Sequence, residues 1–487
     1  MKISIENLGP LTHAEFDLKP LTVFIGDNRQ GKTQAIVTTT TMLSDYGLNA
    51  FMNRYLNHPE LGKFEEIEKL YADLTTSGQA GINLIEFSEK NIRTYYNDLG
   101  RLTPQYLSNI LGYTISTRKI QLSYTLSSQN ITEISAGILN SNIEKSQSGS
   151  VLQVTKELGD PRLYIYIEPG KKLTLPKSAV IHILLQLVIG TLHKIYCPNL
   201  YLFPSERAGF ALLLTQIQQP PNISAGPQSV PPIKQENEQN LLPYSLAQYM
   251  GLIHSSLLFG SLQQRKEHAS QRPNVAKLLE LTELLNIITQ DKITLSKSEP
   301  SLPRKIQITV NERVMDVQAA SSGVKSLIGL SLYLQYKAQP RDLIVIDEPE
   351  QNLHPNQQAA FAEFLAILVN NGIRVAITTH SPYIIEHLQN LILAHDLKDK
   401  KEIINSLYLK REDAFISKEN VGVYLFQNGT AENILMEDGE INWQTFCDTA
   451  NTIGNITSLV YDKQHEEREL QTHAAKMSVA EDKPEYR

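Results

Sequence analysis

The sequence predicts an α/β fold built on a largely parallel sheet, and two observations carry that prediction. An apolar run at Leu21–Ile25 leads into a glycine-containing loop and then a helical pattern from about Lys32. Much later, strand patterns at Asp342–Ile346 and Arg374–Thr378 alternate with a helical pattern at Pro355–Asn370. Because parallel strands are joined by crossover helices, this alternation indicates a parallel sheet.

Antiparallel strands are expected on either side of this core in the sequence. Lys2–Glu6 and Ala14–Leu18 alternate apolar and polar residues on either side of a Gly-Pro turn. Near the other end, Asn428-Gly429 separates Val421–Phe426 from Ala431–Leu435. An Asn-Gly pair between two alternating runs predicts a β-hairpin.

At 487 residues the chain is too long for one ordinary core. We expect residues 1–210 and 291–440 to form one α/β head, interrupted by a helical insertion near 46–150. Residues 211–290 should be a proline-rich linker followed by helices, and 441–487 a charged, helical tail.

The composition is that of a soluble globular protein, with 41% hydrophobic and 20% charged residues. A formal net charge of -7 gives no global basic field for nucleic-acid binding. Cys197 and Cys447 are far apart in the sequence, which fits a reducing cytoplasm. The apolar stretch Ala179–Leu192 is too short for a bilayer span, so we expect a buried helix and no membrane partner.

The loop after the first apolar strand has the full pattern G-x-x-x-x-G-K-[ST]. Its residues are Gly26, Asp27, Asn28, Arg29, Gln30, Gly31, Lys32 and Thr33. The pattern arises by chance in roughly one or two chains of this length per hundred, and its strand-loop-helix context makes chance rarer still. Its backbone N–H groups would cradle phosphates, Lys32 would reach the β- and γ-phosphates of ATP, and Thr33 would bind Mg²⁺.

A second motif places two carboxylates at the end of an apolar strand, at Asp347 and Glu348. Open α/β sheets bind ligands at this edge. Asp347 would hold Mg²⁺, and Glu348 would polarise the attacking water. Solvated acids at a strand end are common, so this motif gains its weight from occurring together with the phosphate loop.

Two further motifs fit the same site. His380 follows the next strand and could contact the γ-phosphate. A lone histidine at a strand end is more often structural, but the position of His380 one strand after the acidic pair reverses that preference. Ser322 and Gly323 begin a helix whose N-terminal end could bind a second phosphate surface. The alternative for these two residues is a plain helix cap.

Taken in order, the four motifs resemble the ABC-type ATPase heads of the SMC, RecF and OLD group, and more narrowly the bacterial AAA-15-type or AAA-21-type ATPases. The resemblance rests on the start of the chain, on Asp347–Pro355 (DEPEQNLHP) and on Leu202–Phe210 (LFPSERAGF). It covers about half of the chain, near 1–45, 200–210 and 305–435.

The resemblance implies an ABC-type P-loop ATPase head whose two copies hold ATP between them. Ser322 and Gly323 would then complete the site of the opposite copy, and Asn352 and His354 would lie in the D-loop at the interface. His380 would be the switch histidine. The signature departs from the transporter pattern, since Lys325 stands in place of glutamine. The segment at residues 205–207, Ser-Glu-Arg, is the candidate for the Q-loop switch.

The function expected from the resemblance is an ATPase that dimerises or oligomerises around ATP and regulates a separately encoded nuclease or toxin, as in bacterial anti-phage defence. A fused OLD-type nuclease is not expected, because no Asp-x-Asp pair follows His380. The alternative is a RecF- or SMC-like DNA-repair or chromosome-maintenance ATPase that binds duplex DNA. A transporter subunit and a P-loop kinase each leave part of the motif set unexplained.

Overall fold

The computed structural model describes most of the chain. The described residues are 1–57, 61–113, 120–143, 151–196, 199–214, 243–259, 261–296, 304–442, 452, 454–465 and 467–468. Both cysteines and the proline-rich part of the expected linker lie outside these residues. The contacts divide the chain into two units, Met1–Gly439 and Glu440–Arg487. In the second unit, residues 454–465 are helical.

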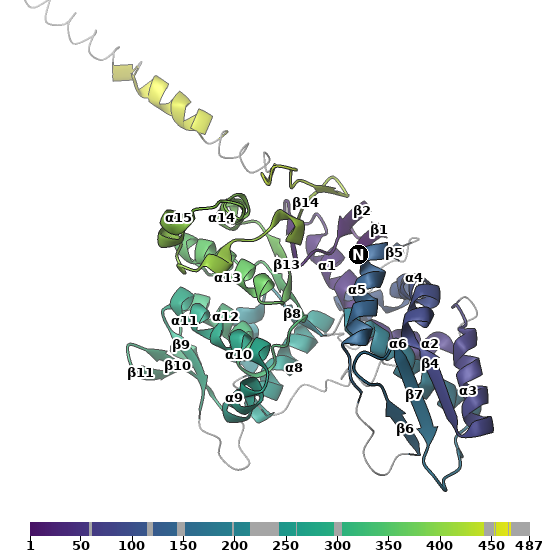
Figure 1. Ribbon diagram of the computed structural model, residues 1–487. Coiled ribbons are helices and arrows are strands. Elements are labelled where there is room, and N and C mark those ends of the chain that lie inside the picture. Colours follow the sequence, from purple (N-terminus) through teal and green to yellow (C-terminus); the bar gives the residue numbers. More distant parts are fainter. Residues whose placement is uncertain are drawn as a thin grey trace, which may run out of the picture. The chain divides into compact units, whose positions relative to one another are not determined.

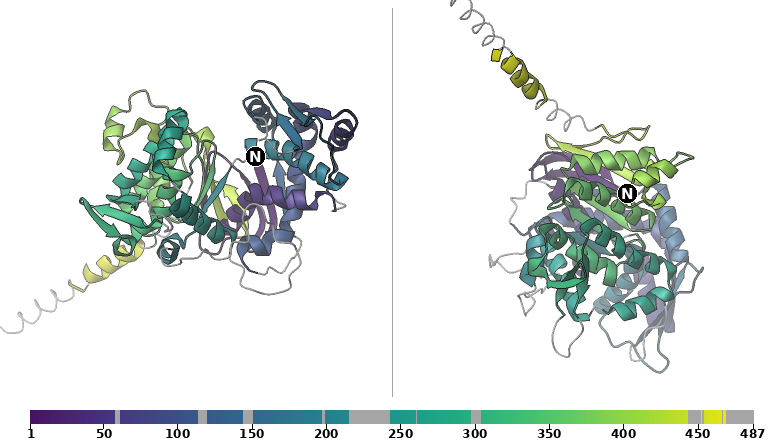
Figure 2. Two further views of the ribbon diagram at one scale, coloured as in Figure 1. Left: turned by 90° about the horizontal axis from the view of Figure 1, so that it is seen from below. Right: turned by 90° about the vertical axis from the view of Figure 1, so that its left-hand side faces the viewer.

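The centre of the first unit is a six-stranded mixed sheet. Its strands, in spatial order, are β15 (Thr430–Asn433), β14 (Val421–Gln427), β3 (Leu21–Ile25), β13 (Arg374–Thr379), β12 (Leu343–Asp347) and β8 (Leu200–Phe203). All neighbouring pairs are parallel except β14 with β15, which form the expected hairpin. Strand β3, which is purple in Figures 1 and 2, pairs with the green strands β13 and β14, which come more than 300 residues later in the sequence.

Both faces of the strands β14, β3, β13 and β12 are largely buried, which explains why these strands are nearly continuous apolar runs. Phe24, Val345 and Ala376 point to one face and join a hydrophobic cluster with helix α1 (Lys32–Met42). The alternate residues of the same strands are buried toward the other face. There α13 (Pro355–Asn370) contacts β13 and β3.

A three-stranded antiparallel sheet lies at the start of the chain, and the sequence predicted two of its strands. Its order is β2 (Leu11–Asp17), β1 (Lys2–Leu8), β5 (Gln121–Thr125). The outer strand β5 comes from the insertion near 46–150, which we expected to be helical. That insertion therefore contributes a strand to the N-terminal sheet.

The rest of the insertion is mostly helical, with one further strand. Its elements are α2 (Asp45–Tyr55), α3 (Glu65–Ser77), β4 (Gln79–Asn83), α4 (Leu84–Leu111) and α5 (Ser128–Leu139). Strand β4 belongs to a second antiparallel sheet with β7 (Arg162–Ile167) and β6 (Leu152–Thr155). The strand pattern of β4 covers only five residues between two helices, so its pairing depends on a segment about 80 residues away.

Helix α6 (Lys177–Tyr196) is long and apolar enough, by length and composition alone, to cross a membrane. A share of 56% of its most apolar window is buried inside the protein. Its buried His193 lies 2.8 Å from the hydroxyl of Tyr95 in α4. These contacts are those of a core helix, as the sequence predicted.

The remaining elements flank the sheet. They are α7 (Arg207–Leu214), α8 (Tyr244–Phe259), α9 (Leu262–Ser270), α10 (Pro273–Glu280), α11 (Thr282–Thr289), β9 (Lys292–Leu295), β10 (Ile306–Val310), β11 (Arg313–Asp316), η1 (Val317–Ala319), α12 (Ser322–Tyr336), α14 (Pro382–Leu393), α15 (Lys401–Ser406), η2 (Glu412–Ala414) and η3 (Lys418–Asn420). Strands β9 to β11 form an antiparallel sheet. Helix α12 contacts α7, α8 and α11.

Candidate ATP site

The loop between β3 and α1 needs glycine at two positions. Gly26 has φ 134°, and a Cβ there would lie 2.2 Å from the carbonyl oxygen of Phe426. Gly31 has φ 87° at the N-cap of α1, where a Cβ would lie 2.8 Å from Leu11 Cγ. A side chain at either position would clash, and positive φ is strained for other residues. The loop geometry thus explains the spacing of the two glycines.

The backbone N–H groups of the loop are available to a ligand. In the described part of the chain, those of Asn28, Arg29, Gln30 and Gly31 donate no hydrogen bond to protein atoms. The side chains of Asp27 to Arg29 are exposed. A run of free N–H groups at the N-terminal end of a helix is a binding site for phosphate oxygens.

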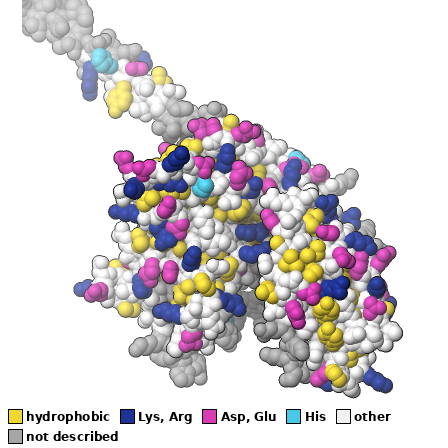
Figure 3. Space-filling view, in the orientation of Figure 1, with side chains coloured by type: hydrophobic (Ala, Val, Ile, Leu, Met, Phe, Trp, Pro, Cys, Tyr) yellow, Lys and Arg dark blue, Asp and Glu magenta, His cyan; other side chains and the backbone are white. Residues whose placement is uncertain are grey.

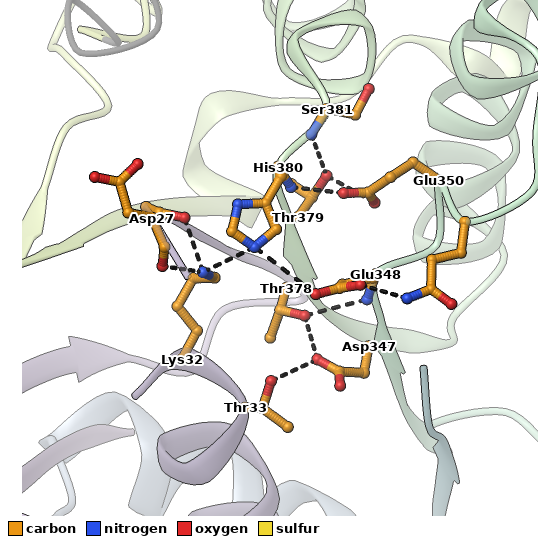
Figure 4. Close-up of polar contacts among 12 residues, drawn as sticks. Asp27, Lys32, Thr33, Asp347, Glu348, Glu350, Thr378, Thr379, His380 and Ser381 are labelled. Carbon is orange, nitrogen blue, oxygen red and sulfur yellow. Dashed lines mark hydrogen bonds and ion pairs between the residues drawn. The ribbon is translucent and has the colours of Figure 1, made fainter. Parts of the chain in front are cut away.

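Lys32 begins α1 with its side chain folded back over the loop (Figure 4). Its Nζ donates to the carbonyl oxygens of Gly26 and Asp27, both at 2.8 Å. Burial lowers the pKa of this ammonium, while the carboxylates of Glu348 and Asp347 oppose that shift. The charge is therefore held inside the site and surrounded by acceptors that phosphate oxygens could replace.

Asp347, the last residue of β12, is buried beside the first turn of α1. Its Oδ1 accepts hydrogen bonds from the hydroxyls of Thr33, at 2.7 Å, and of Thr378. Asp347 and Thr378 are cross-strand partners in the parallel register, so both point to the face that α1 covers. Burial raises the pKa of Asp347, and the two hydroxyl donors oppose that shift.

The donor set at this point fits Mg²⁺. A hydroxyl oxygen and a carboxylate oxygen are hard ligands of the kind that Mg²⁺ prefers, and it is usually bound by few protein groups together with phosphates and waters. Among the described residues, no group of three or more His, Cys, Asp or Glu side chains is placed to hold a metal ion. Thr33 and Asp347 are the residues that would hold it.

Glu348 follows in a left-handed conformation, with φ 48°. Its N–H donates to the carbonyl oxygen of Thr378 at 3.0 Å, and its Oε1 lies 3.7 Å from His380 Nε2. Gln351 donates to the other carboxylate oxygen. A non-glycine residue at positive φ is strained, and here that conformation turns the carboxylate toward the phosphate loop.

His380 lies between the two charged groups of the site. Its Nε2 is 3.1 Å from Lys32 Nζ and 3.7 Å from Glu348 Oε1. Burial and, next, the nearby Lys32 ammonium lower the pKa of His380, so the neutral imidazole is favoured. The five side chains predicted from separate motifs (Lys32, Thr33, Asp347, Glu348, His380) thus meet at one edge of the sheet, as Figure 4 shows.

Glu350 is a site residue that the sequence analysis did not single out. Its Oε1 accepts from the backbone N–H of His380 at 2.6 Å, and its Oε2 accepts from the hydroxyl of Thr379 at 2.9 Å. Burial raises the pKa of Glu350. The only sequence signal was a third acid two residues after Glu348. Its contacts orient the segment that carries the histidine.

The signature and D-loop residues lie against one another instead of against the phosphate loop. A Cβ on Gly323 would lie 2.8 Å from the carbonyl oxygen of Asn352. Ser322 and Asn352 are exposed. Within the described residues, no hydrogen bond or ion pair joins Ser322, Gly323 or Asn352 to residues 26–33. His354 is the exposed N-cap of α13.

The segment expected to act as the Q-loop separates into two parts. Ser205 and Glu206 line a cavity of about 180 Å³ that Thr33 and Asp347 also line. Arg207 instead points into the protein, where only 2% of it is exposed. Its guanidinium donates to the carbonyl oxygens of Asp347 and Glu348 at 2.6 and 2.9 Å. Burial lowers the pKa of this arginine, and the nearby Tyr249 and Asp347 oppose that shift.

Part of the sequence matches a known protein family. Residues 222–385 match the family model AAA_15, described as an AAA ATPase domain. The matched range includes β12, α13, β13 and His380, and it lies outside the phosphate loop at 26–33. No curated protein matches the sequence significantly.

Several solved structures of SMC head domains are similar to the chain. An SMC head bound to the C-terminal winged-helix domain of ScpA is 10% identical, with a TM-score of 0.34, and the match covers 89% of this chain and 96% of that one. The SMC head of Thermotoga maritima is 10% identical, with a TM-score of 0.30 and coverage of 90% and 98%. An SMC head with an extended coiled coil, bound to a ScpA domain derived from Pyrococcus furiosus, is 9% identical, with a TM-score of 0.32 and coverage of 89% and 95%.

The family model covers residues 222–385, about a third of the chain. Residues 222–385 are thus similar to AAA ATPase domains, and the first unit has an α/β fold with a mixed sheet at its centre.

Proposed function

We propose that this protein binds ATP and Mg²⁺ between two copies of itself, hydrolyses the ATP, and uses that cycle to regulate a separately encoded effector in bacterial anti-phage defence. The observation that carries the proposal is the meeting of Lys32, Thr33, Asp347, Glu348 and His380 at one sheet edge. The proposed location is the cytoplasm.

Each side chain has a distinct task in the proposed reaction. Lys32 leaves the loop carbonyls and binds the β- and γ-phosphate oxygens. Glu348 accepts a proton from the attacking water, and His380 hydrogen-bonds the γ-phosphate. Bound Mg²⁺ would neutralise charge on the phosphate oxygens. Because His380 lies between Lys32 and Glu348, it can transmit the presence of the γ-phosphate to both side chains.

A site shared between two copies is supported by the position of the signature and D-loop residues relative to the phosphate loop of their own copy. Ser322 and Asn352 are exposed and form no hydrogen bond with residues 26–33 in the described part of the chain. The N–H groups at the start of α12 are a suitable partner for an anion. A second copy could therefore close over the ATP with these residues, so that ATP binding is also the signal for assembly.

The defence role rests on the resemblance to AAA-15-type and AAA-21-type proteins, in which an ATPase head often accompanies a separate nuclease or toxin. Purification of the chain with the product of its chromosomal neighbour tests this part. A complex whose stability depends on ATP is expected. If the neighbour fails to associate in every nucleotide state, the effector proposal is wrong while the ATPase proposal stands.

Duplex DNA is the less favoured partner. Two arginines from Lys/Arg-rich segments of the sequence illustrate this: Arg265 is buried, and the guanidinium of Arg411 forms ion pairs with Asp413. On the face in Figure 3, lysine and arginine side chains are interspersed with acidic ones. Such mixed charge is typical of a solvated surface.

Hydrolysis is tested by Glu348→Gln. Loss of the general base should lower turnover by about 10²–10⁴-fold, while ATP affinity stays within about twofold, because an amide of the same size still occupies the position. Glu386→Gln, an exposed glutamate on α14, is the matched control. Full turnover in the Glu348 variant would remove this residue from the mechanism.

Assembly is tested by sedimentation of the same Glu348→Gln variant with and without ATP. Trapped ATP should produce a dimer or larger species. Adding Ser322→Glu should prevent that association, since a carboxylate would face the phosphates of the other copy. Ser322→Ala is the matched control and should still associate. A Ser322→Glu protein that assembles as well as its parent would contradict the shared site.

A further inference from the structure

A buried arginine connects the helix that carries the signature residues to the strand end that carries the proposed base. Arg207, at the start of α7, has a 2% exposed side chain. Its Nη1 and Nη2 donate to the carbonyl oxygens of Asp347 and Glu348, at 2.6 and 2.9 Å. Its Nε donates to the carbonyl oxygen of Ser326 in α12, at 3.0 Å. One side chain therefore bonds two elements at once.

The bonds continue to the exposed end of α12. The hydroxyl of Ser326 donates to the carbonyl oxygen of Gly323 at 2.7 Å. Gly323 in turn approaches Asn352 so closely that a Cβ would lie 2.8 Å from that carbonyl oxygen. The path from the signature glycine to the proposed base thus consists of one serine and one arginine.

The arginine is itself held firmly between neighbouring helices. Its Nη1 also donates to the carbonyl oxygen of Pro204 at 3.2 Å. The hydroxyl of Tyr249 in α8 donates to the backbone carbonyl of Arg207 at 3.3 Å. Tyr249 lies so close to α12 that a Cβ on Gly329 would lie 2.2 Å from its ring. A shift of α12 would therefore also move the guanidinium group of Arg207.

The far end of the path is strained. Glu348 has φ 48°, a conformation that needs support from its surroundings. The guanidinium fork binds the two successive carbonyls on either side of the Glu348 N–Cα bond, and a rigid fork of this kind fixes direction as well as distance. Burial of a charge without partners would be costly, and here the charge is compensated by carbonyl groups of the elements whose geometry is important for hydrolysis.

We propose that Arg207 is a positioning residue that transmits the position of the signature helix α12 to the backbone of Glu348, so that capture of ATP by one copy's Ser322 and Gly323 adjusts the base in that same copy's own site. The proposal rests on the shared ATP site proposed above. It makes the two ATP sites of a dimer communicate through each subunit.

The first test is Arg207→Lys, compared with Arg265→Lys. An ammonium cannot bind both carbonyls as the fork does, so kcat should fall about 10–100-fold, the effect of one or two lost charged hydrogen bonds. ATP affinity should stay within about twofold, because Arg207 does not contact the loop. Arg265 is also buried and also donates to a backbone carbonyl, that of Ala338 just beyond the other end of α12, so its variant controls for loss of a buried arginine.

The second test asks for transmission through the helix. In a double-mutant cycle on kcat, Arg207→Lys and Ser322→Ala should be non-additive, since the second change would act through a connection already broken. Simple additivity would overturn the proposal. An unchanged kcat in the Arg207 variant, or an equal loss of kcat in the Arg265 variant, would also overturn it.

If Arg207→Lys does not fold, Ser326→Ala tests the other end of the path, because it removes the hydroxyl bond to Gly323 and leaves the carbonyl oxygen that accepts from Arg207. It should lower kcat about 3–10-fold, the effect of one neutral hydrogen bond. Ser331→Ala is the matched control, because Ser331 is also buried in α12. Normal turnover in the Ser326 variant would overturn the proposal. If the wild-type protein hydrolyses no ATP, the proposed function itself fails, which is a distinguishable result.

Discussion

Strand β12 follows one buried aspartate, Asp342, and ends in another, Asp347, and the two differ in what surrounds them. Asp342 accepts from Asn199 Nδ2 at 2.7 Å, from the Tyr333 hydroxyl at 2.9 Å and from the Gln339 N–H at 2.8 Å. These donors are neutral groups of the fold. Burial raises the pKa of Asp342 to about 6.

Asp347 has a different set of neighbours. Its hydroxyl donors come from the first turn of α1 and from β13, and the ammonium of Lys32 contributes to the electrostatics of the same site. Both carboxylates are buried, so burial does not distinguish Asp342 from Asp347, the proposed Mg²⁺ ligand. Their positions in the sheet do distinguish the two aspartates, because only the carboxyl ends of parallel strands face the loops and helix starts that bind phosphate.

The contrast between the two aspartates is tested most directly by replacing each of them with asparagine. Asp347→Asn should lower Mg²⁺-dependent turnover by about 10²–10³-fold, since a carboxylate that helps hold the metal supports several kcal/mol of charge stabilisation. Steady-state ATPase assays over a Mg²⁺ series measure this. Asp342→Asn provides the internal control, and an equal loss there would mean that both acids act only through the fold.

A smaller effect is expected on binding alone. Lys32→Ala should weaken ATP binding about 10–100-fold, because one or two hydrogen bonds between the ammonium and phosphate oxygens are lost. Titration with a fluorescent ATP analogue measures the affinity. Lys337→Ala is a suitable control, since burial lowers the pKa of that lysine too but it follows α12, away from the loop. Unchanged affinity in the Lys32 variant would place ATP elsewhere.

The C-terminal edge of the sheet could largely be predicted from the sequence because its signals are local. The glycine pattern, the apolar strand before Asp347 and the strand before His380 each lie within about ten residues of the side chain they identify. The alternation of strands and helices then brings such strand ends to one edge. The roles assigned to the individual side chains stay predictions.

The other features of the fold and of the site depend on long-range contacts that no local sequence pattern indicates. Arg207 donates to a carbonyl 140 residues later in the chain, and Glu350 accepts from the backbone N–H of His380, which follows the neighbouring strand. Strand β5 pairs with β1 although a long and mostly helical segment separates them in the sequence. A short alternating run within a helical region can be identified as a strand only when its partner is known.

The smallest effect on activity should come from Asp342→Asn, with turnover within about twofold of the wild type, because Asp342 lies at the start of β12, away from the phosphate loop. Its effect on stability should instead depend on pH. The pKa of Asp342 is about 6 in the folded protein and 3.8 in the reference state, so the folded protein binds this proton more tightly. Its contribution to stability is therefore fully present below about pH 4 and is lost as the pH rises through 6.

Asn does not titrate, so the comparison of the two proteins isolates this group. Between pH 7 and pH 4 the wild type should gain on the order of 3 kcal/mol in unfolding free energy relative to Asp342→Asn, which is a shift of roughly two pKa units at 1.36 kcal/mol each. Urea unfolding of both proteins across that range measures the difference. A difference that does not change with pH would mean that Asp342 is not protonated in the folded protein within this range, and the contrast between the two ends of β12 would then reduce to geometry alone.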